Sequence, residues 1–425
     1  MDADVLILGA GFTGVAAARD LKEAGRSAII LEARDRIGGR TWYREIPETG
    51  VWAEYGGMFI SRETQPALAA EITRYGIGVL EPEDPDVVAW IRGDRRETGT
   101  EPIDRIRTKL ADSQLTDAIE HTAKAFASEG REALAPLDVP VAGWVDELGA
   151  DPEASDYLRS FMAAMGGSRI DLMSVLPLLW DMVELGYTPA DAYVDMGELF
   201  ADGTKSLIDA MAEGLDVRFG SVVTAVTRDA DGVTVTLLDG TSLRAQAAIV
   251  ALPLNVWSDI TFEPALAPPK QRAATQRHVG EVSKVIALVR GGPDTYLGAG
   301  WDTPVSAGFI SKPALDGHLF MGFSSQNRVD LADREAMSSA VRAHLPDSDV
   351  VWTGGHDWIT DPFSKGTWLS VPPTWFSDGT FDALREPEGR VLFAGSDIAA
   401  EGAGWIEGAV GSGREAAADA QHLLA

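Results

Sequence analysis

The start of the chain alternates between apolar runs and a glycine-rich turn, a pattern that predicts a strand, a helix and a second strand. Residues 5–8 (VLIL) form a short apolar run typical of a central parallel strand. The glycine-rich turn at residues 9–14 leads into strong helix formers at residues 15–24. Residues 28–31 (AIIL) form a second apolar run. The pattern therefore predicts a parallel βαβ unit.

The rest of the chain divides into a helical part and further groups of strands. Residues 82–200 have mostly the spacing of helices. Residues 217–252 alternate as strands do, and the pair at 239–240 (DG) is a hairpin signal. Residues 282–358 predict a second sheet, and residues 391–397 a buried strand that ends in small and acidic residues. We therefore expect an α/β fold class, α+β overall.

Composition narrows the possible partners. The 425 residues include 36 Lys and Arg against 65 Asp and Glu, and the formal net charge of −29 argues against nucleic acids and anionic membranes. The absence of Cys excludes disulfides, a catalytic thiolate, iron–sulfur ligation and a cofactor tethered through cysteine. The 6 His are too scattered to predict a metal site. We expect a cytoplasmic protein, since neither a signal peptide nor a spanning segment is visible.

The glycines of the first turn have the spacing that binds a dinucleotide. Gly9 allows the tight turn, Gly11 lets backbone N–H groups approach a pyrophosphate, and Gly14 lets the helix pack closely on the strand. The helix N-terminus would face the phosphates. Glu32 follows about 20 residues on, where an acid binds the ribose hydroxyls. The alternative, a tight turn that binds nothing, is weakened by the strand, helix and acid around it.

Two further glycine pairs indicate a longer ligand. Gly39 belongs to the first pair and is followed by Arg40, whose charge suits a pyrophosphate. Gly56 and Gly57 form the second pair. Three such contacts suit an extended dinucleotide that carries a flat ring system. Ordinary turn glycines are the alternative, because the chain has 44 Gly.

These motifs resemble those of the flavin-dependent monoamine oxidase family. The resemblance rests on residues 32–34 (EAR), 37–41 (IGGRT) and 56–57 (GG), and near the end of the chain on 391–397 (VLFAGSD) and 404–413 (GWIEGAVGSG). Within the family the chain looks most like the bacterial 6-hydroxynicotine oxidases. The resemblance implies a Rossmann-type FAD-binding domain with an inserted sheet-plus-helices substrate domain. The implied FAD-binding segments are 1–80, 203–283 and 385–425, and the substrate-binding segments are 81–202, mostly helical, and 284–384.

The resemblance also implies which residues bind the cofactor, FAD, here noncovalently because Cys is absent. Asp397 would accept a hydrogen bond from the ribityl chain of the flavin; the alternative is that it serves as a helix N-cap. Ile406 would place a backbone N–H at flavin O2. Val223 would contact the adenine end, with a plain core valine as the alternative. The remaining implied contacts lie inside the motifs: Phe12, Thr13, Ala33, Arg34, Met58, Gly395 and Ser396.

Three residues would carry the catalysis. Lys284 interrupts an apolar strand and matches the family lysine that holds a water beside flavin N5; a lysine on a solvated strand face is the alternative. Trp368 and Trp405 match the pair of aromatic residues that flank the substrate amine. Two indoles would make an apolar slot with cation–π capacity. Ordinary core packing is the alternative, because the chain has 12 Trp.

The resemblance implies an FAD-dependent amine oxidase. The α carbon of a small amine, cyclic or N-methyl secondary and 6-hydroxynicotine-like, would give hydride to flavin N5. The imine would be hydrolysed and O2 reduced to H2O2. The alternatives are an amine dehydrogenase or C–C desaturase with another acceptor, and a flavin-binding protein without turnover. A homodimer is left open.

Overall fold

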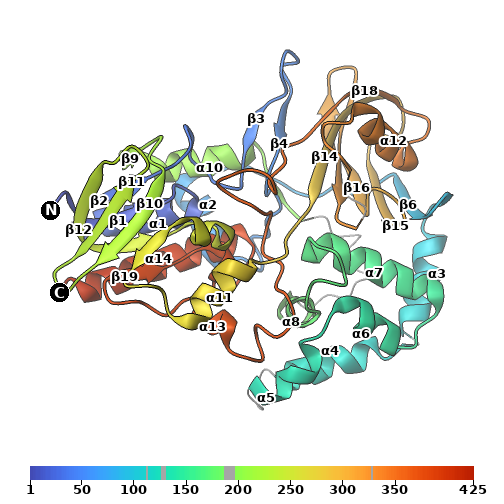
Figure 1. Ribbon diagram of the computed structural model, residues 1–425. Helices are drawn as coiled ribbons and strands as arrows, with labels where there is room; N and C mark the ends of the chain where they lie inside the picture. Colours follow the sequence, from blue (N-terminus) through green and yellow to red (C-terminus); the bar gives the residue numbers. More distant parts are fainter. Residues whose placement is uncertain (112, 126–130, 186–196, 327–328) are drawn as a thin grey trace.

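A computed structural model of the protein describes residues 1–111, 113–125, 131–185, 197–326 and 329–425. Two large β-sheets lie toward opposite ends of an elongated molecule, and helices pack against both (Figure 1). The two termini lie beside the first sheet. This mixture of parallel and antiparallel strands with helices confirms the predicted α/β, α+β class.

The first sheet has eight strands around the predicted βαβ unit. In spatial order they are β13 (Thr261–Glu263), β10 (Val223–Arg228), β11 (Val233–Leu237), β12 (Ser242–Val250), β1 (Ala3–Leu8), β2 (Ala28–Leu31) and β9 (Asp216–Arg218), and β19 (Val391–Phe393) also pairs with β12. β1 runs parallel to both β12 and β2. The predicted hairpin turn joins β11 to β12, with Gly240 at φ +87°. The βαβ unit and the hairpin are confirmed.

Helices cover both faces of the first sheet. One face carries α1 (Phe12–Glu23), α2 (Pro66–Tyr75), α10 (Gly203–Ala212) and α14 (Ile406–Leu423). The other carries η3 (Leu254–Asp259), α11 (Pro268–Gln276) and α13 (Thr380–Ala383). Burial on both faces explains why the central strands are apolar throughout.

The second sheet has seven strands. In spatial order they are β18 (Asp349–Gly354), β14 (Ser283–Arg290), β17 (Gly317–Ser324), β16 (Ala307–Ala314), β15 (Tyr296–Trp301), β6 (Val87–Arg92) and β7 (Arg95–Thr98). One face packs against α12 (Arg334–His344). The other packs against helices of the 101–185 segment, above all α7 (Pro152–Gly166).

The remaining elements are short. The other helices of the middle segment are α3 (Glu101–Ala111), α4 (Leu115–Lys124), α5 (Arg131–Leu134), η2 (Ala135–Leu137), α6 (Val141–Glu147) and α8 (Leu176–Leu185). Two small ladders pair β3 (Tyr43–Glu45) with β4 (Trp52–Glu54) and β5 (Val79–Leu80) with β8 (Leu199–Phe200). A short helix, η4 (Ser396–Ile398), follows β19.

The stretch 82–200, expected to be mostly helical, also contributes β6 and β7 to the second sheet. The parallel partner of β6 is β15, about 200 residues further along the chain, so only long-range pairing reveals this strand. Parts of the predicted helical stretch, residues 112, 126–130 and 186–196, lie outside the described residues. In the described part of the chain, no helix is both long and apolar enough to cross a bilayer.

Candidate active site

Two adjoining cavities bring the predicted site residues together. The first, about 360 Å³, is lined by the glycine turns, the ends of first-sheet strands, the 358–368 loop and the start of α14. The second, about 550 Å³, is lined by residues of the middle helices and the second sheet together with residues 56–59, 368–385 and 399–406. Six residues line both cavities: Gly56, Gly57, Trp368, Gly404, Trp405 and Ile406.

The turn between β1 and α1 is as tight as its glycines predict. Gly9 has φ +98°, and a Cβ there would lie 2.8 Å from the Ala251 carbonyl oxygen. A Cβ on Gly14 would lie 2.0 Å from the Gly9 carbonyl oxygen. Gly11 is the N-cap of α1 and offers no capping side chain, so the first-turn N–H groups are left for another acceptor. An anionic group in the first cavity suits this helix N-terminus.

Glu32 closes the turn from the end of β2. Its carboxylate accepts from the Ala10 N–H at 2.7 Å and from the Arg34 N–H at 2.8 Å, and its side chain lines the first cavity. An ionised carboxylate can accept about four hydrogen bonds, so acceptor capacity remains for a ribose. The two backbone contacts fix its orientation.

The Arg34 guanidinium forms part of the wall of the first cavity. It donates to both carboxylate oxygens of Asp361, at 2.8 and 2.7 Å, and to Ser364 Oγ at 2.9 Å. It also lies 5.3 Å from the ring centroid of Phe363. Burial opposes ionisation of Asp361, but hydrogen bonds from His356 and Arg34 prevail and hold its pKa below the usual range. The network ties the 361–364 loop to the glycine turns.

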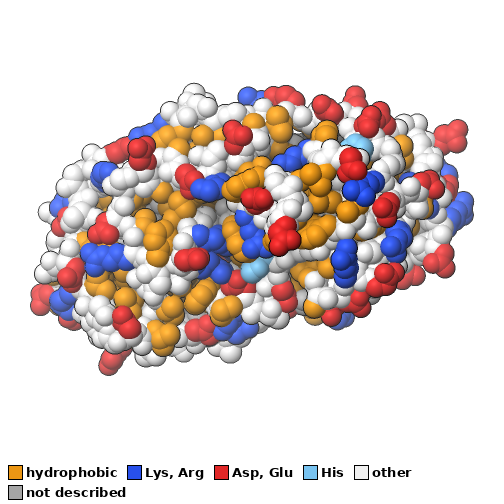
Figure 2. All heavy atoms as spheres, turned by 90° about the horizontal axis from the view of Figure 1, so that it is seen from above, with side chains coloured by type: hydrophobic (Ala, Val, Ile, Leu, Met, Phe, Trp, Pro, Cys, Tyr) orange, Lys and Arg blue, Asp and Glu red, His pale blue; other side chains and the backbone are white. Residues whose placement is uncertain are grey.

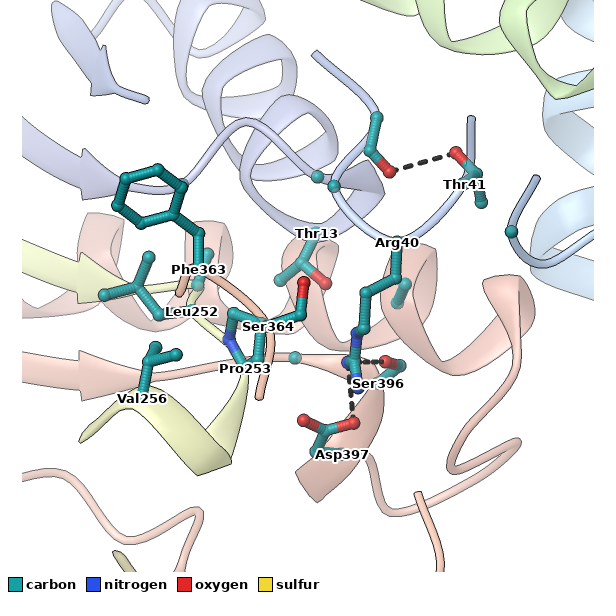
Figure 3. A pocket seen from close by; sticks show the side chains of 18 of the residues that line it. Thr13, Arg40, Thr41, Leu252, Pro253, Val256, Phe363, Ser364, Ser396 and Asp397 are labelled. Carbon is teal, nitrogen blue, oxygen red and sulfur yellow. Dashed lines mark hydrogen bonds and ion pairs between the residues drawn. The ribbon is translucent and has the colours of Figure 1, made fainter. Parts of the chain in front are cut away.

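Half-buried Arg40 and buried Asp397 form an ion pair in the lining of the first cavity (Figure 3). The Arg40 guanidinium donates to Asp397 Oδ1 at 2.6 Å, to Ser396 Oγ at 3.0 Å and to the Thr367 carbonyl. The other carboxylate oxygen of Asp397 accepts from the Leu254 N–H at 3.0 Å. Burial opposes the charge on Asp397, and Arg40 reverses that effect, so its pKa is lowered. Arg40 thus contacts three protein groups.

The lining of the first cavity fits a flavin dinucleotide. The N-terminus of α1, without a capping side chain, and the Glu32 carboxylate lie at the glycine turn, and Leu252, Pro253, Val256 and Phe363 supply apolar walls (Figure 3). At the far side α14 begins after Trp405, again without a capping side chain. Its free first-turn N–H groups suit an electron-rich flavin oxygen.

Lys284 projects from β14 into the junction of the cavities. It is 4% exposed, which rules out the solvated strand face. Its Nζ donates to the Gly56 carbonyl oxygen at 2.8 Å and to Met58 Sδ at 3.0 Å. Burial lowers the pKa of Lys284 far below its ordinary value, and the charge of Glu54 opposes that shift. The lysine is therefore far easier to deprotonate than a surface lysine.

Trp368 and Trp405 both line both cavities. The Trp368 indole N–H donates to the Met165 carbonyl oxygen at 3.0 Å, and its ring meets Phe323 edge-on. Gly167 makes room for it, since a Cβ there would lie 2.4 Å from the indole. Both residues therefore belong to the walls of the cavities, as the prediction of an aromatic pair requires.

Most predicted cofactor residues line the first cavity: Gly9, Gly11, Phe12, Thr13, Glu32, Ala33, Arg34, Gly39, Arg40, Gly56, Gly57, Val223, Gly395, Ser396, Asp397 and Ile406. Two predicted residues lie elsewhere. Met58 lines only the second cavity, beside Lys284. Gly14 lines neither cavity and instead packs α1 onto the turn.

Sequence reasoning missed several wall residues. Residues 251–256 follow the carboxyl end of β12, and ligands of parallel sheets bind outside such ends, so this rule could have found them. Tyr55, Trp358 and Phe363 also line the first cavity. Tyr55 directly precedes the Gly56–Gly57 pair, so that motif could have indicated it, whereas Trp358 and Phe363 lie in an irregular segment that only the fold brings to the cavity.

Comparison with known proteins decides the family. The family model described as flavin containing amine oxidoreductase matches residues 12–421. The chain belongs to this family. It is therefore an FAD-dependent oxidoreductase that acts on amines, as the sequence motifs predicted.

Relatives with known names match nearly the whole length of the chain. The chain is 31% identical to the (S)-6-hydroxynicotine oxidase of Paenarthrobacter nicotinovorans, over 96% of each chain. It is 29% identical to a pseudooxynicotine dehydrogenase of a Pseudomonas species, over 98% of this chain and 85% of the relative. Its fold is similar to that of a cofactor-redesigned putrescine oxidase variant, with a TM-score of 0.87 at 26% identity over 99% of each chain. Cyclohexylamine oxidase from Brevibacterium oxydans gives a TM-score of 0.84 at 25% identity, over 100% of each chain.

Proposed function

We propose that the protein oxidises a cyclic or N-methyl secondary amine that carries an apolar or aromatic ring, a 6-hydroxynicotine-like substrate, with O2 as the electron acceptor. The observation that carries the proposal is the shared boundary of the two cavities. Trp368, Trp405 and the Gly56–Gly57 turn belong to both, and Lys284 stands beside that turn. Cofactor and amine would meet there.

The second cavity has the lining that such an amine requires. Aromatic and aliphatic side chains dominate it, among them Phe161, Leu178, Leu297, Phe309, Phe323 and Phe376. An apolar chamber excludes water and favours the neutral over the cationic amine. The indoles of Trp368 and Trp405 would hold the amine with its α carbon toward the first cavity.

Bound FAD supplies the hydride acceptor and then the electrons that reduce O2. The chain contributes position and proton transfer. With its lowered pKa, Lys284 would hold a water at the junction and accept its proton as the water adds to the product imine. The water oxygen would form the new C–O bond, and Lys284 would return the proton to the nitrogen as the C–N bond breaks, which gives a carbonyl product and an amine.

The relatives support this class of substrate. One is named for (S)-6-hydroxynicotine and another for pseudooxynicotine. The solved relatives are named for putrescine and cyclohexylamine, which shows that related chains act on different amines. The substrate therefore needs direct measurement.

Anaerobic mixing tests the proposal. We expect bleaching of the flavin absorbance by 6-hydroxynicotine or an N-methylpyrrolidine, slower bleaching by a linear diamine, and H2O2 when O2 is admitted. No bleaching by any cyclic or N-methyl amine, secondary or tertiary, would contradict the proposed substrate class. Bleaching by linear diamines alone would contradict the cyclic substrate.

A dehydrogenase is the second candidate. Two relatives, 29% identical, are named pseudooxynicotine dehydrogenase and nicotine dehydrogenase. Reduced enzyme that is reoxidised slowly by O2 but quickly by a one-electron dye would favour a dehydrogenase.

The cytoplasmic location, the homodimer, the domain boundaries and the roles of the individual site residues stay predictions.

A further inference from the structure

Glu54 is a buried carboxylate that the reaction described above does not use. It ends β4, two residues before the Gly56 carbonyl that accepts from Lys284, and is 6% exposed. It lines neither cavity. A buried acid is costly to ionise unless other groups stabilise its charge.

The protein holds Glu54 firmly against α10. The Thr204 N–H donates to one carboxylate oxygen at 2.5 Å and the Thr204 hydroxyl donates to the other at 3.0 Å. The N-cap residue of α10, Asp202, makes no capping hydrogen bond of its own, so Glu54 serves as the cap from another element. A Gln could cap the helix equally well, because an amide oxygen also accepts hydrogen bonds, so capping alone does not account for a carboxylate here.

The charges around Glu54 require more than a cap. Two lysines lie beside Glu54: buried Lys284 of β14 donates to the Gly56 carbonyl two residues further on, and half-buried Lys312 of β16 donates to the hydroxyl of Tyr43 at 3.3 Å. Tyr43 is the cross-strand partner of Glu54 and a further titratable neighbour, and Asp202 adds a negative charge near Tyr43. For Lys284, Glu54 supplies the attraction that offsets burial.

We propose that Glu54 is a positioning residue for Lys284: its carboxylate, fixed at the first turn of α10, governs whether the buried lysine is an ammonium or a free amine. The inference rests on the proposed function, in which Lys284 holds a water and takes its proton. Burial raises the pKa of Glu54 and lowers that of Lys284, so the two groups compete for one proton near neutral pH.

The test is a pH titration of Lys284 followed by NMR in the holoenzyme without substrate, with the lysines labelled with ¹³C at Cε. The Lys284 signal is identified as the one that is missing in Lys284→Met. Glu54→Gln keeps the cap acceptor and removes the charge, so we expect the Lys284 titration midpoint to fall by about 1 pH unit or more. Glu54→Asp keeps the charge and should restore most of the midpoint. A Glu54→Gln midpoint equal to that of the wild type would overturn the proposal.

The matched control is Glu407→Gln. Glu407 also accepts from two first-turn N–H groups, those of Ala67 and Leu68 at the start of α2. Loss of this capping charge should leave the Lys284 midpoint in place. An equal shift in Glu407→Gln would overturn the proposal, since any capping carboxylate would then have the same effect.

A reciprocal measurement leaves Glu54 itself unchanged, in case Glu54→Gln does not fold. In Lys284→Met, the Glu54 carboxyl resonance should titrate at higher pH than in the wild type, because its stabilising cation is gone. An unchanged Glu54 midpoint would overturn the proposal. Neither titration involves amine turnover, so shifted midpoints in a protein that oxidises no amine would contradict only the proposed function.

Discussion

Two lysines show how similar burial can serve different purposes. Lys270 is 1% exposed, donates to the Glu386 carbonyl and lies 3.5 Å from Glu388. It lines neither cavity and has a carboxylate partner. Lys284 is equally buried, but its partners are a carbonyl and a thioether at the cavity junction. The location of the charge, rather than its burial, distinguishes the two.

Lys284→Met should therefore reduce turnover and leave FAD bound. We expect the steady-state rate to fall by about 10²–10⁴-fold, the usual contribution of a general acid–base group. FAD should stay because Lys284 touches the predicted FAD site at Gly56 and Met58, whereas the 9–14 turn, Glu32 and Arg40 are left unchanged. Stopped-flow absorbance and the ratio of FAD to protein measure the two quantities.

Lys270→Met is the matched control. It removes a buried lysine from the core behind the first sheet, where Arg228 still pairs with Glu388. Turnover per bound FAD should change by less than about threefold, because Lys270 lines neither cavity and a residue outside the site is coupled to it only weakly. Equal losses in both variants would show that burial of any lysine, rather than the position of Lys284, explains the rate.

At the scale of elements, α1 and the turn before it work as one unit. Gly14 lies in the first turn of the helix and touches the turn carbonyl, whereas Gly11 faces open space. The absence of a side chain therefore matters differently at the two positions: at Gly14 it allows the helix to pack on the turn, and at Gly11 it leaves room for the ligand.

Gly14→Ala and Gly11→Ala should separate these roles. The added methyl of Gly14→Ala meets the Gly9 carbonyl, so we expect the unfolding free energy to fall by about 1–3 kcal/mol with or without FAD. Gly11→Ala has room and an ordinary φ of −73°, so the apoprotein should keep its stability. Its methyl would project into the first cavity and weaken FAD binding by about tenfold, or about 1.4 kcal/mol. Denaturant melts and FAD titration measure the effects; equal behaviour of the two variants would contradict the division.

Local elements were predictable, and contacts between distant segments were not. The βαβ unit, the hairpin and the glycine motifs follow from spacing within about 30 residues. The membership of β6 in the second sheet and the Arg34–Asp361 contact join residues far apart in the chain. The pairing of Arg40 with Asp397, in place of a free guanidinium, likewise depends on how the two ends of the chain meet. Periodicity and motif spacing carry no such information.

At the scale of the molecule, the first cavity is assembled from segments throughout the chain. Its lining comes from residues 9–57, 221–260, 282–284, 358–368 and 395–409. A ligand that contacts all of these segments holds both ends of the chain and both sheets together. Binding and global stability should therefore be linked.

FAD should stabilise the whole protein. We expect the melting temperature of the apoprotein to rise with FAD concentration, with a gain of about 2.7 kcal/mol at 100 times the Kd. Calorimetry of the apoprotein across an FAD series measures it. A transition that stays fixed while FAD fluorescence reports binding would show that the cofactor contacts only one locally stable part.

On the face drawn in Figure 2, acidic side chains are scattered among basic and hydrophobic ones, and the whole chain carries a net charge of −29. Like charges spread in this way favour solubility over attachment to anionic surfaces.

The contact between the two ends of the chain has a consequence for biosynthesis. Residues 404–409 help to line the first cavity, and α14 packs on α1. A growing polypeptide on the ribosome can fold its opening strand and turn early, but the chamber stays open on one side until this late segment emerges. Tight retention of the coenzyme should then follow translation of residues 404–409, and products that terminate before them should bind it weakly.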